Sequence, residues 1–183
     1  MQKNNRASKT RFITVASGKG GVGKSMFSSN LAYLMASAGV KVGIFDADIG
    51  LANLDVMFNV SVKKNILHLL KGEASLDEVL IRVMDNLILI PGESGSEILN
   101  YSDSAIFTQF MKEAEVLNDL DVLIIDTGAG ISKNTQLFLQ AADDVIIITV
   151  PDPAAITDAY ATVKVAARER NDMLMVINQV ANE

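Results

Sequence analysis

The stretch Gly18-Lys19-Gly20-Gly21-Val22-Gly23-Lys24-Ser25 decides the fold of this chain. It follows an apolar run and opens a helical pattern, which is the context that the phosphate-binding pattern G-x-x-x-x-G-K-[ST] requires. Glycines let successive backbone N–H groups point inward at phosphate oxygens, and the helix N-terminus adds partial positive charge. The Lys24 ammonium can reach the β- and γ-phosphates, and the Ser25 hydroxyl can ligate Mg²⁺. The stretch therefore predicts a site for a nucleoside triphosphate and Mg²⁺.

A second glycine pattern overlaps the first. Gly18, Gly20 and Gly23 also satisfy G-x-G-x-x-G, and Asp46 ends the next predicted strand about twenty residues on, where a dinucleotide-binding fold keeps an acid for the ribose. The lysine and serine that close the stretch decide between the two interpretations. A dinucleotide loop has no use for them, whereas a triphosphate–Mg²⁺ site needs both.

Short apolar runs alternate with longer helical patterns along the chain. The runs are continuous, which is typical of strands buried on both faces of a parallel sheet. Strand–helix alternation predicts right-handed βαβ units. We therefore expect an α/β fold, a P-loop NTPase with a mostly parallel sheet and helices on both faces. The predicted strands are residues 12–17, 42–45, 87–90, 122–125, 145–150 and 173–177, and the predicted helices are residues 25–38, 66–70, 76–83, 104–117, 133–142 and 154–168.

Two of these helices carry signals at their ends. Gly39 follows the first helix as a stop residue, and Asp152 before Pro153 predicts an N-cap with proline at the first helical position. The first helix also has an apolar stripe that we expect to face the core, formed by Phe27, Leu31, Leu34 and Ala38.

Acidic residues end two of the predicted strands, where ligands bind in open α/β sheets. Asp46 and Asp48 follow the second run, and Asp126 closes the run 122–125 before a glycine-rich segment. An acid after four apolar residues is a Walker B pattern, and phosphoryl transfer needs acids near Mg²⁺ and near the attacking water. Each acid alone fits a solvated strand end or a helix cap equally well. Together with the glycine loop they favour a functional site.

Two further polar residues are weaker candidates. Asn178, after the sixth predicted strand, either hydrogen-bonds a base edge or starts a turn, and the pattern leaves both open. His68 is the only histidine, and we expect a surface residue rather than a catalytic base.

Composition and charge exclude several classes of function. Of the 183 residues, 49% are apolar and 21% are charged, which is typical of one soluble globular domain rather than a disordered chain. Four of the sixteen basic residues lie in the first eleven positions, which hold no acid. The rest of the chain therefore has twelve basic and twenty-two acidic residues, a net charge of −10. That charge disfavours nucleic acid as a partner, because DNA binding needs a basic face.

The chain contains no cysteine, which excludes disulfides, thiolate zinc sites and cysteine-ligated iron–sulfur clusters. No apolar run approaches the roughly 18 residues of a membrane span. The basic N-terminus lacks the apolar segment of a signal peptide. We expect a disordered arm at residues 1–10 and a P-loop ATPase domain at residues 11–183.

The motifs resemble those of the MinD/ParA ATPases. The glycine loop, with its extra Lys19, resembles the deviant Walker A motif of that family. Residues 46–55 (DADIGLANLD) look like its switch I, and residues 126–130 (DTGAG) look like its switch II. Many members have proline at the position of Gly128. Residues 126–132 (DTGAGIS) and 151–161 (PDPAAITDAYA) are instead similar to the flagellar branch, FlhG, FleN or YlxH, and the resemblance covers residues 11–183.

The resemblance implies a slow, partner- or membrane-stimulated ATPase that forms an ATP-dependent sandwich dimer. Its implied catalytic residues have separate roles. Lys19 reaches the nucleotide of the partner subunit, and Lys24 binds the phosphates within its own subunit. Asp48 positions or activates the attacking water.

The same resemblance implies ATP and Mg²⁺ as cofactors. Ser25 holds Mg²⁺ directly, and Asp46 and Asp126 hold it through water. Asn178 matches the residue that recognises adenine. The residues implied to bind the nucleotide are Gly18, Lys19, Gly20, Gly21, Val22, Gly23, Lys24, Ser25, Met26, Gly130 and Asn178.

The flagellar branch sets flagellar number and placement together with the GTPase FlhF and flagellar switch components. This predicts those partners, a cytoplasmic location and contact with the inner face of the cell membrane. Members usually continue past the sixth strand with further strands and a membrane-targeting helix, and many carry an N-terminal segment that activates FlhF. Residues 1–183 show neither pattern, so we expect an ATPase domain without these parts.

Two other functions fit the same motifs. A ParA-type ATPase that positions DNA or cargo is the nearer alternative, although the net charge of −10 disfavours it. The other is a nucleotide-switched binding protein with negligible hydrolysis, which differs from a slow ATPase only in degree. Related ATPases that carry iron–sulfur clusters need cysteines, which this sequence lacks.

Overall fold

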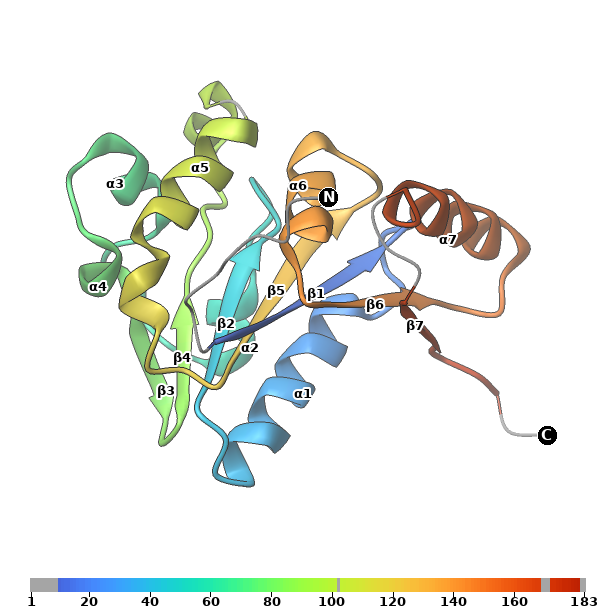
Figure 1. Ribbon diagram of the computed structural model, residues 1–183, viewed down its shortest axis with the longest axis horizontal. Coiled ribbons are helices and arrows are strands. Elements are labelled where there is room, and N and C mark those ends of the chain that lie inside the picture. The colour runs from blue at the N-terminus through green and yellow to red at the C-terminus, as the bar shows by residue number, and fades with distance from the viewer. Residues whose placement is uncertain (1–9, 102, 169–171, 182–183) are drawn as a thin grey trace.

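Seven strands form one sheet in the order β3-β4-β2-β5-β1-β6-β7 (Figure 1). The computed structural model describes residues 10–101, 103–168 and 172–181; residues 1–9 of the predicted arm lie outside this part. All neighbouring strands are parallel except β3, which runs antiparallel to β4. The strands are β1 (Arg11–Ser17), β2 (Val42–Ala47), β3 (Ile81–Met84), β4 (Leu87–Ile90), β5 (Val122–Ala129), β6 (Asp144–Thr149) and β7 (Leu174–Ile177).

Helices cover both faces of this sheet (Figure 1). The helices α1 (Lys24–Ser37) and α2 (Leu54–Phe58) pack on one face. The other face carries α3 (Ile66–Lys71), α4 (Leu76–Val79), α5 (Asp103–Glu113), α6 (Lys133–Ala141) and α7 (Pro153–Ala166), with the short 3₁₀ helices Ser96–Asn100 and Ala114–Leu117. The predicted class, a mostly parallel sheet between two helical layers, is confirmed.

Alternate residues of each central strand enter different cores. In β2, Phe45 packs under α5 and α6, while Ile44 packs under α1. Phe45 stacks on Phe110 with ring centroids 4.6 Å apart, and Phe138 meets Phe45 edge-on at 5.7 Å. A strand buried on both sides needs apolar residues at every position, which explains the continuous runs of the sequence.

The predicted stripe of the first helix is half right, because Phe27 and Leu31 pack against the core whereas Leu34 and Ala38 are exposed. Leu34 is 64% exposed, whereas the buried side chains of α1 are the small Ser28, Ser29, Ala32 and Ala36, together with Lys24. Small side chains let the helix backbone lie close to the sheet, so packing rather than apolar periodicity sets the inward face. The helix ends before Gly39, whose φ of +90° confirms the predicted stop.

Two elements near the sheet edge were not predicted. The helix expected at residues 76–83 ends at Val79, and Ile81–Met84 forms β3 instead. A tight turn joins β3 to β4, with Asn86 at a φ of 63°, a left-handed conformation that asparagine tolerates. Ile81 is β-branched, a type of residue that favours strands, and it pairs with Leu89 of β4, while the register shifts between Arg82 and Met84. The short helix α2 was missed as well.

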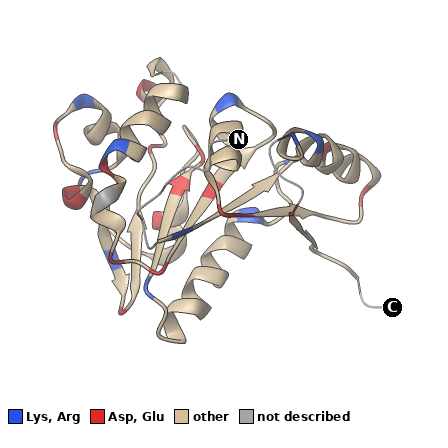
Figure 2. Ribbon diagram, viewed as in Figure 1, with Lys and Arg blue, Asp and Glu red and all other residues tan. Residues whose placement is uncertain are grey.

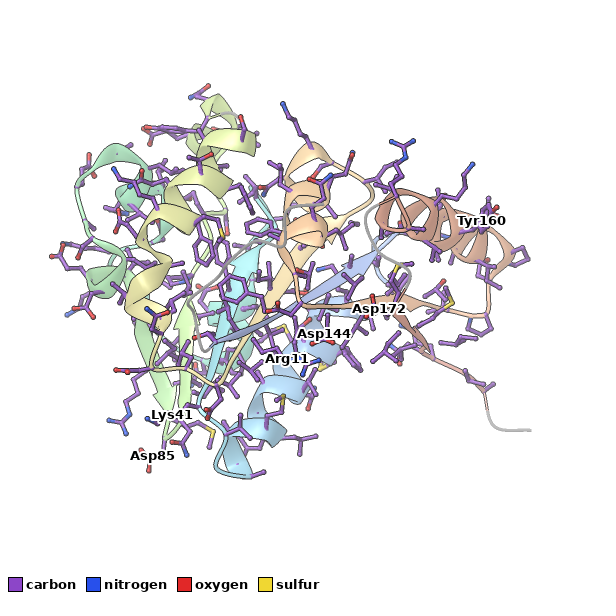
Figure 3. The ribbon with its side chains drawn as sticks, viewed as in Figure 1. Arg11, Lys41, Asp85, Asp144, Tyr160 and Asp172 are labelled. Carbon is purple, nitrogen blue, oxygen red and sulfur yellow. The ribbon has the colours of Figure 1, made fainter. Side chains whose placement is uncertain are left out.

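The amino ends of β1 and β6 are tied together by charge. Arg11 lies beside Asp144, and its Nη2 donates to Asp144 Oδ1 at 2.8 Å (Figure 3). Thr10, just before β1, is buried, and its hydroxyl donates to the carbonyl oxygens of Leu117 and Leu120. The polar residues singled out above lie at the other end of the strands, at the carboxyl edge of the sheet.

None of the helices in the described part of the chain is long and apolar enough to cross a membrane.

Candidate functional site

The glycine loop joins the end of β1 to the first turn of α1. The N-cap of α1 is Gly23, whose φ of 87° is left-handed and provides no side-chain cap. The first N–H groups of α1 are therefore left for a ligand, as expected of an anion-binding loop. A cavity of about 290 Å³ lies over the loop, and its lining consists of residue 17, residues 19–26, Asp48, Asn53 and Ala129.

A second cavity of about 590 Å³ adjoins the first and shares part of its lining. Asp48 and Ala129 line both cavities, and the larger one extends along residues 47–53 to Leu99. The glycine loop, Asp48 and the end of β5 at Gly128 and Ala129 thus line one continuous hollow at the carboxyl edge of the sheet. The remaining predicted residues, Gly18, Asp46, Asp126, Gly130 and Asn178, lie outside the cavity linings.

Lys24 lies at the bottom of this hollow in a buried ion pair. Its Nζ is 3.0 Å from Asp126 Oδ1, and the two side chains are only 7% and 1% exposed. The same carboxylate oxygen accepts a 2.8 Å hydrogen bond from the Ser28 hydroxyl. Asp126 Oδ2 is buried with no hydrogen-bond partner. The carboxylate therefore has one oxygen that is fully used and one that is available to a ligand.

Asp46 lies opposite Asp126 in the register of β2 and β5, so two carboxylates lie on neighbouring strands. β5 continues to Ala129, which places Asp126 inside the strand rather than after it. Burial raises the pKa of Asp46 to about 6 against the lowering effect of hydrogen bonds from backbone N–H groups. Asn53 and Leu54 both donate to Asp46 Oδ2 at 2.8 Å. Asp46 thereby anchors the start of α2.

Asp48 forms part of the wall of the hollow. Burial raises the pKa of its half-buried carboxyl, the charge of Lys24 lowers it, and Asp126 raises it further. A Cβ on Gly128 would lie 3.0 Å from Asp48 Oδ1, so the glycine leaves room for this carboxylate. Asp48 is therefore close to the switch II segment as well as to the glycine loop.

The segment after β4 holds the loop that carries Asp48. Gly50 N–H donates to the Glu93 carbonyl at 2.9 Å, and the Ser94 hydroxyl donates to the Ala52 carbonyl at 2.7 Å. Glu93 is itself fixed, because Asn65 Nδ2 donates to its carboxylate at 2.6 Å. Residues 48–53 are thus held from two sides, by Asp46 and by residues 93–94.

Lys19 lies at the outer rim of the loop in an exposed ion pair. Its Nζ is 3.1 Å from Asp152 Oδ1, with the two side chains 45% and 49% exposed. Asp152 also accepts from Ala155 N–H at 2.9 Å, and Pro153 is the first residue of α7, which confirms the predicted N-cap. The Ala155 N–H and then Lys19 lower the pKa of Asp152.

Three other predicted residues lie around the loop. Met26 is exposed on the cavity lining, and Gly130 N–H donates to the Ser17 carbonyl at 2.8 Å. Asn178 lies behind the loop, where its Nδ2 donates to the Val22 carbonyl at 2.9 Å. His68 lies outside the linings of both cavities and takes part in the N-terminal capping box of α3, where it is half-buried rather than the surface residue that was expected.

The donor set fits a magnesium ion that is completed by phosphate and water. Mg²⁺ in nucleotide sites usually takes one or two carboxylates and keeps several waters. The Ser25 hydroxyl and Asp126, whose Oδ2 has no hydrogen-bond partner, suit this role. Asp46 already accepts hydrogen bonds from three N–H groups, so it suits a contact with the cation through water only. Among the described residues, no cluster of three or more metal-ligating side chains forms a site by itself.

Ser28 was not among the predicted site residues, although its hydroxyl donates to the Asp126 carboxylate. It lies one turn after Lys24 on the same side of α1, and this spacing of four residues is the signal that would have found it. The backbone N–H groups of Asn53 and Leu54 had no comparable signal, because their role depends on the path of the loop.

Comparison with known proteins places the chain in a family. The ParA family model, described as NUBPL iron-transfer P-loop NTPase, matches residues 8–182. The flagellum site-determining protein YlxH of Helicobacter pylori is 55% identical over 173 residues, which cover 94% of this chain and 59% of that protein. The antiactivator FleN of Pseudomonas aeruginosa is 35% identical over 158 residues, covering 86% of this chain and 56% of that protein. The chain thus spans less than two thirds of these relatives.

A solved structure agrees with this assignment. The septum site-determining protein MinD of Pyrococcus horikoshii, complexed with Mg-ADP, superposes with a TM-score of 0.81 over 92% of this chain and 70% of that chain. At 24% identity this likeness shows the shared fold. With the family match over nearly the whole chain and the flagellar relatives, it shows that the chain belongs to the ParA/MinD family of P-loop NTPases.

Proposed function

We propose that this chain is the ATP-binding part of a MinD-like switch protein that hydrolyses ATP to ADP and controls flagellar number and placement. The observation that carries the proposal is the buried Lys24–Asp126 pair beneath a glycine-lined cavity with Asp48 in its wall. A buried lysine on a helix N-terminus suits a polyphosphate, because its charge and the free N–H groups of the loop act on the same anion.

Each side chain of the hollow has a proposed role. Lys24 binds the β- and γ-phosphates, and on binding it exchanges part of its contact with Asp126 for phosphate oxygens. Ser25 ligates Mg²⁺, and Asp126 and Asp46 orient its water ligands. Mg²⁺ neutralises charge on the phosphates when it is bound.

Asp48 is the proposed positioning group for the attacking water. Its carboxylate accepts a hydrogen bond from that water and orients the oxygen toward the γ-phosphorus. The water oxygen forms a bond to the γ-phosphorus while the bond from that phosphorus to the β,γ-bridging oxygen breaks, so the products are ADP and inorganic phosphate. The proton of the water goes to the Asp48 carboxylate or to the phosphate product. Two sides of its loop are fixed by Asp46 and by residues 93–94, which supports a defined position for this group.

Lys19 is proposed to act on a second copy of the chain. It lies at the exposed rim of the loop, and its pair with Asp152 is open to solvent and easily exchanged. In an ATP-dependent dimer it contacts the facing triphosphate. The name of the YlxH relative supports the flagellar setting. From the resemblance to the flagellar branch, the proposal adds an FlhF-type GTPase and flagellar switch components as partners, and a cytoplasmic location with peripheral membrane contact.

The alternative within the same family is a ParA-type ATPase that positions DNA or other cargo. In Figure 2, basic and acidic segments are interspersed along the ribbon of the described part, and the chain has more acidic than basic residues. This distribution favours the flagellar proposal over DNA binding. The other candidate, a switch protein with negligible hydrolysis, would bind ATP at the same site but would hydrolyse almost none of it.

Calorimetric titration of MgATP into the chain tests the proposal. We expect one site per chain, with affinity reduced at least tenfold when EDTA replaces Mg²⁺ or when Ser25 is changed to alanine, because the cation and its hydroxyl ligand are lost. Ser29→Ala is the matched control, since Ser29 donates to a carbonyl of its own helix, Met26 O, at 3.1 Å. No heat of binding in the wild type, or equal affinity in the Ser25→Ala variant, would contradict the proposal.

A further inference from the structure

The end of β7 supports the glycine loop from behind. Asn178 N–H donates to the Thr149 carbonyl at 2.7 Å, which fixes Asn178 to the end of β6. Its side chain then reaches the loop, where Nδ2 donates to the Val22 carbonyl at 2.9 Å. Asn178 therefore connects the sheet to the loop through two hydrogen bonds of good length.

The loop is shaped to receive this side chain. A Cβ at Gly23 would lie 2.4 Å from Asn178 Nδ2, so any larger residue would have to displace the amide from its place beside the loop. The next residue, Gln179, has a left-handed φ of 55°, and its Nε2 lies 3.4 Å from the Gly21 carbonyl, a longer and weaker contact. Two consecutive side-chain amides thus face two consecutive carbonyls of the loop.

Holding these carbonyls also orients the N–H groups on the inside of the loop. The Val22 carbonyl and the Gly23 N–H belong to one planar trans peptide, in which the two groups point in opposite directions. When Asn178 holds the carbonyl outward, the Gly23 N–H turns away from Asn178. Gln179 acts in the same sense on the peptide between Gly21 and Val22. N–H groups turned inward are the ones that bind phosphate oxygens.

We propose that Asn178 is a positioning residue for the phosphate site, which it holds in its binding conformation before any nucleotide arrives. Gln179 gives weaker support at the neighbouring peptide. This inference rests on the proposed function, since it assigns Asn178 a role toward the triphosphate in addition to any contact with the base. It also gives Gly23 a second reason to be glycine, because a larger residue would displace the amide.

Two measurements on Asn178→Ala test the inference. The first is amide hydrogen exchange of residues 18–25 in the nucleotide-free protein, followed by mass spectrometry. The second is the affinity for tripolyphosphate with Mg²⁺, a probe that has no base. Leu174→Ala is the matched control, because Leu174 lies in β7, the strand that Asn178 directly follows, and its side chain is 65% exposed. Thermal unfolding of each variant measures the general stability of the fold.

We expect Asn178→Ala to speed exchange in the loop and to weaken tripolyphosphate binding about fivefold, the effect of one typical hydrogen bond. Leu174→Ala should leave both quantities unchanged, and the melting temperatures of the two variants should agree. A purely structural role for Asn178 would instead lower the melting temperature without a selective effect on the loop or on tripolyphosphate.

The inference is overturned if Asn178→Ala exchanges like the wild type in residues 18–25 and binds tripolyphosphate equally well. A loss for ATP alone would then assign Asn178 to the base only, and the proposed function would stand. If the wild type binds neither ATP nor tripolyphosphate, the proposed function fails. In that case exchange of the nucleotide-free loop still decides whether Asn178 positions it.

Discussion

The two lysines of the glycine loop form ion pairs of nearly equal length in very different surroundings. Lys24 lies 3.0 Å from Asp126 with both side chains almost fully buried, whereas Lys19 lies 3.1 Å from Asp152 with both about half exposed. By distance alone, the two pairs would be expected to contribute equally to the stability of the fold. Burial separates them, because removing one partner of a buried pair leaves a charge without water, while a surface pair exchanges readily with solvent.

The neighbouring carboxylates extend this contrast. Burial raises the pKa of Asp46 on the inner side, while the Ala155 N–H and Lys19 lower the pKa of Asp152 on the outer side. Lys24, at the inner end of the loop, is therefore held in the fold by its buried partner, whereas Lys19, at the outer end, can exchange Asp152 for another partner. This is the arrangement that a cis phosphate contact and a trans contact to a second subunit require.

The largest predicted effect comes from breaking the inner pair. We expect Lys24→Ala to lower the free energy of unfolding by roughly 3–5 kcal/mol, because Asp126 is left buried and unpaired. The double variant Lys24→Met/Asp126→Asn should recover most of this loss and still fail to bind ATP. Urea unfolding measures the stability, and a loss below about 1 kcal/mol in the single variant would show that the pair is not buried as described.

The next effect concerns pH. A carboxyl whose folded pKa is raised from 3.8 to about 6 stabilises the fold fully below pH 4, and this contribution is lost as pH rises through 6. The shift corresponds to about 3 kcal/mol. The free energy of unfolding of Asp46→Asn should therefore gain about 2–3 kcal/mol relative to the wild type between pH 4 and pH 7.5. Parallel pH profiles of the two proteins would refute the role of burial at Asp46.

A smaller effect is expected at the hydroxyl that supports Asp126. Ser28→Ala removes a 2.8 Å donor to a buried carboxylate and should cost about 2 kcal/mol of unfolding free energy. Ser29→Ala, the adjacent buried serine, loses only a local bond to Met26 O and should cost less. Equal losses in the two variants would remove Ser28 from the network around Asp126.

The smallest effect on stability is expected at the outer pair. Lys19→Ala should unfold at the same urea concentration as the wild type in high salt, because water and salt screen exposed charges. Asp152→Asn should also unfold at the same urea concentration as the wild type, since its side-chain oxygen can still accept the N-cap hydrogen bond of α7. Asp152→Ala lacks this oxygen and should destabilise that helix. A clear loss of stability in Lys19→Ala at high salt would mean that the outer pair is part of the fold.

Much of the fold could be predicted because its signals are local. The continuous apolar runs, the glycine loop between a strand and a helix, and Asp152 before Pro153 each lie within a few residues of chain. The same holds for Gly39 at the end of α1. Parallel pairing then brings Asp46 and Asp126 together, since both follow apolar runs of neighbouring strands.

What could not be predicted depends on contacts distant in sequence. Ser28 faces inward because α1 lies close to β5, which overrides the apolar stripe that included the exposed Leu34. The expected helix at residues 76–83 gave way to β3 because the edge of β4 offered a partner for Ile81–Met84. No local pattern in the sequence predicts the hydrogen bonds that join Glu93 to Gly50 and Ser94 to Ala52.

The central claim is that the inner lysine serves its own chain and the outer lysine serves a second one. Light scattering after size exclusion in MgATP tests it on Asp48→Ala, on Asp48→Ala/Lys19→Ala, and on Asp48→Ala/Lys41→Ala as the control with another exposed lysine. We predict the mass of two chains for the first and third proteins and of one chain for the second. An Asp48→Ala/Lys19→Ala variant that dimerises like the other two proteins would contradict the account. So would an Asp48→Ala variant that binds ATP but stays a single chain.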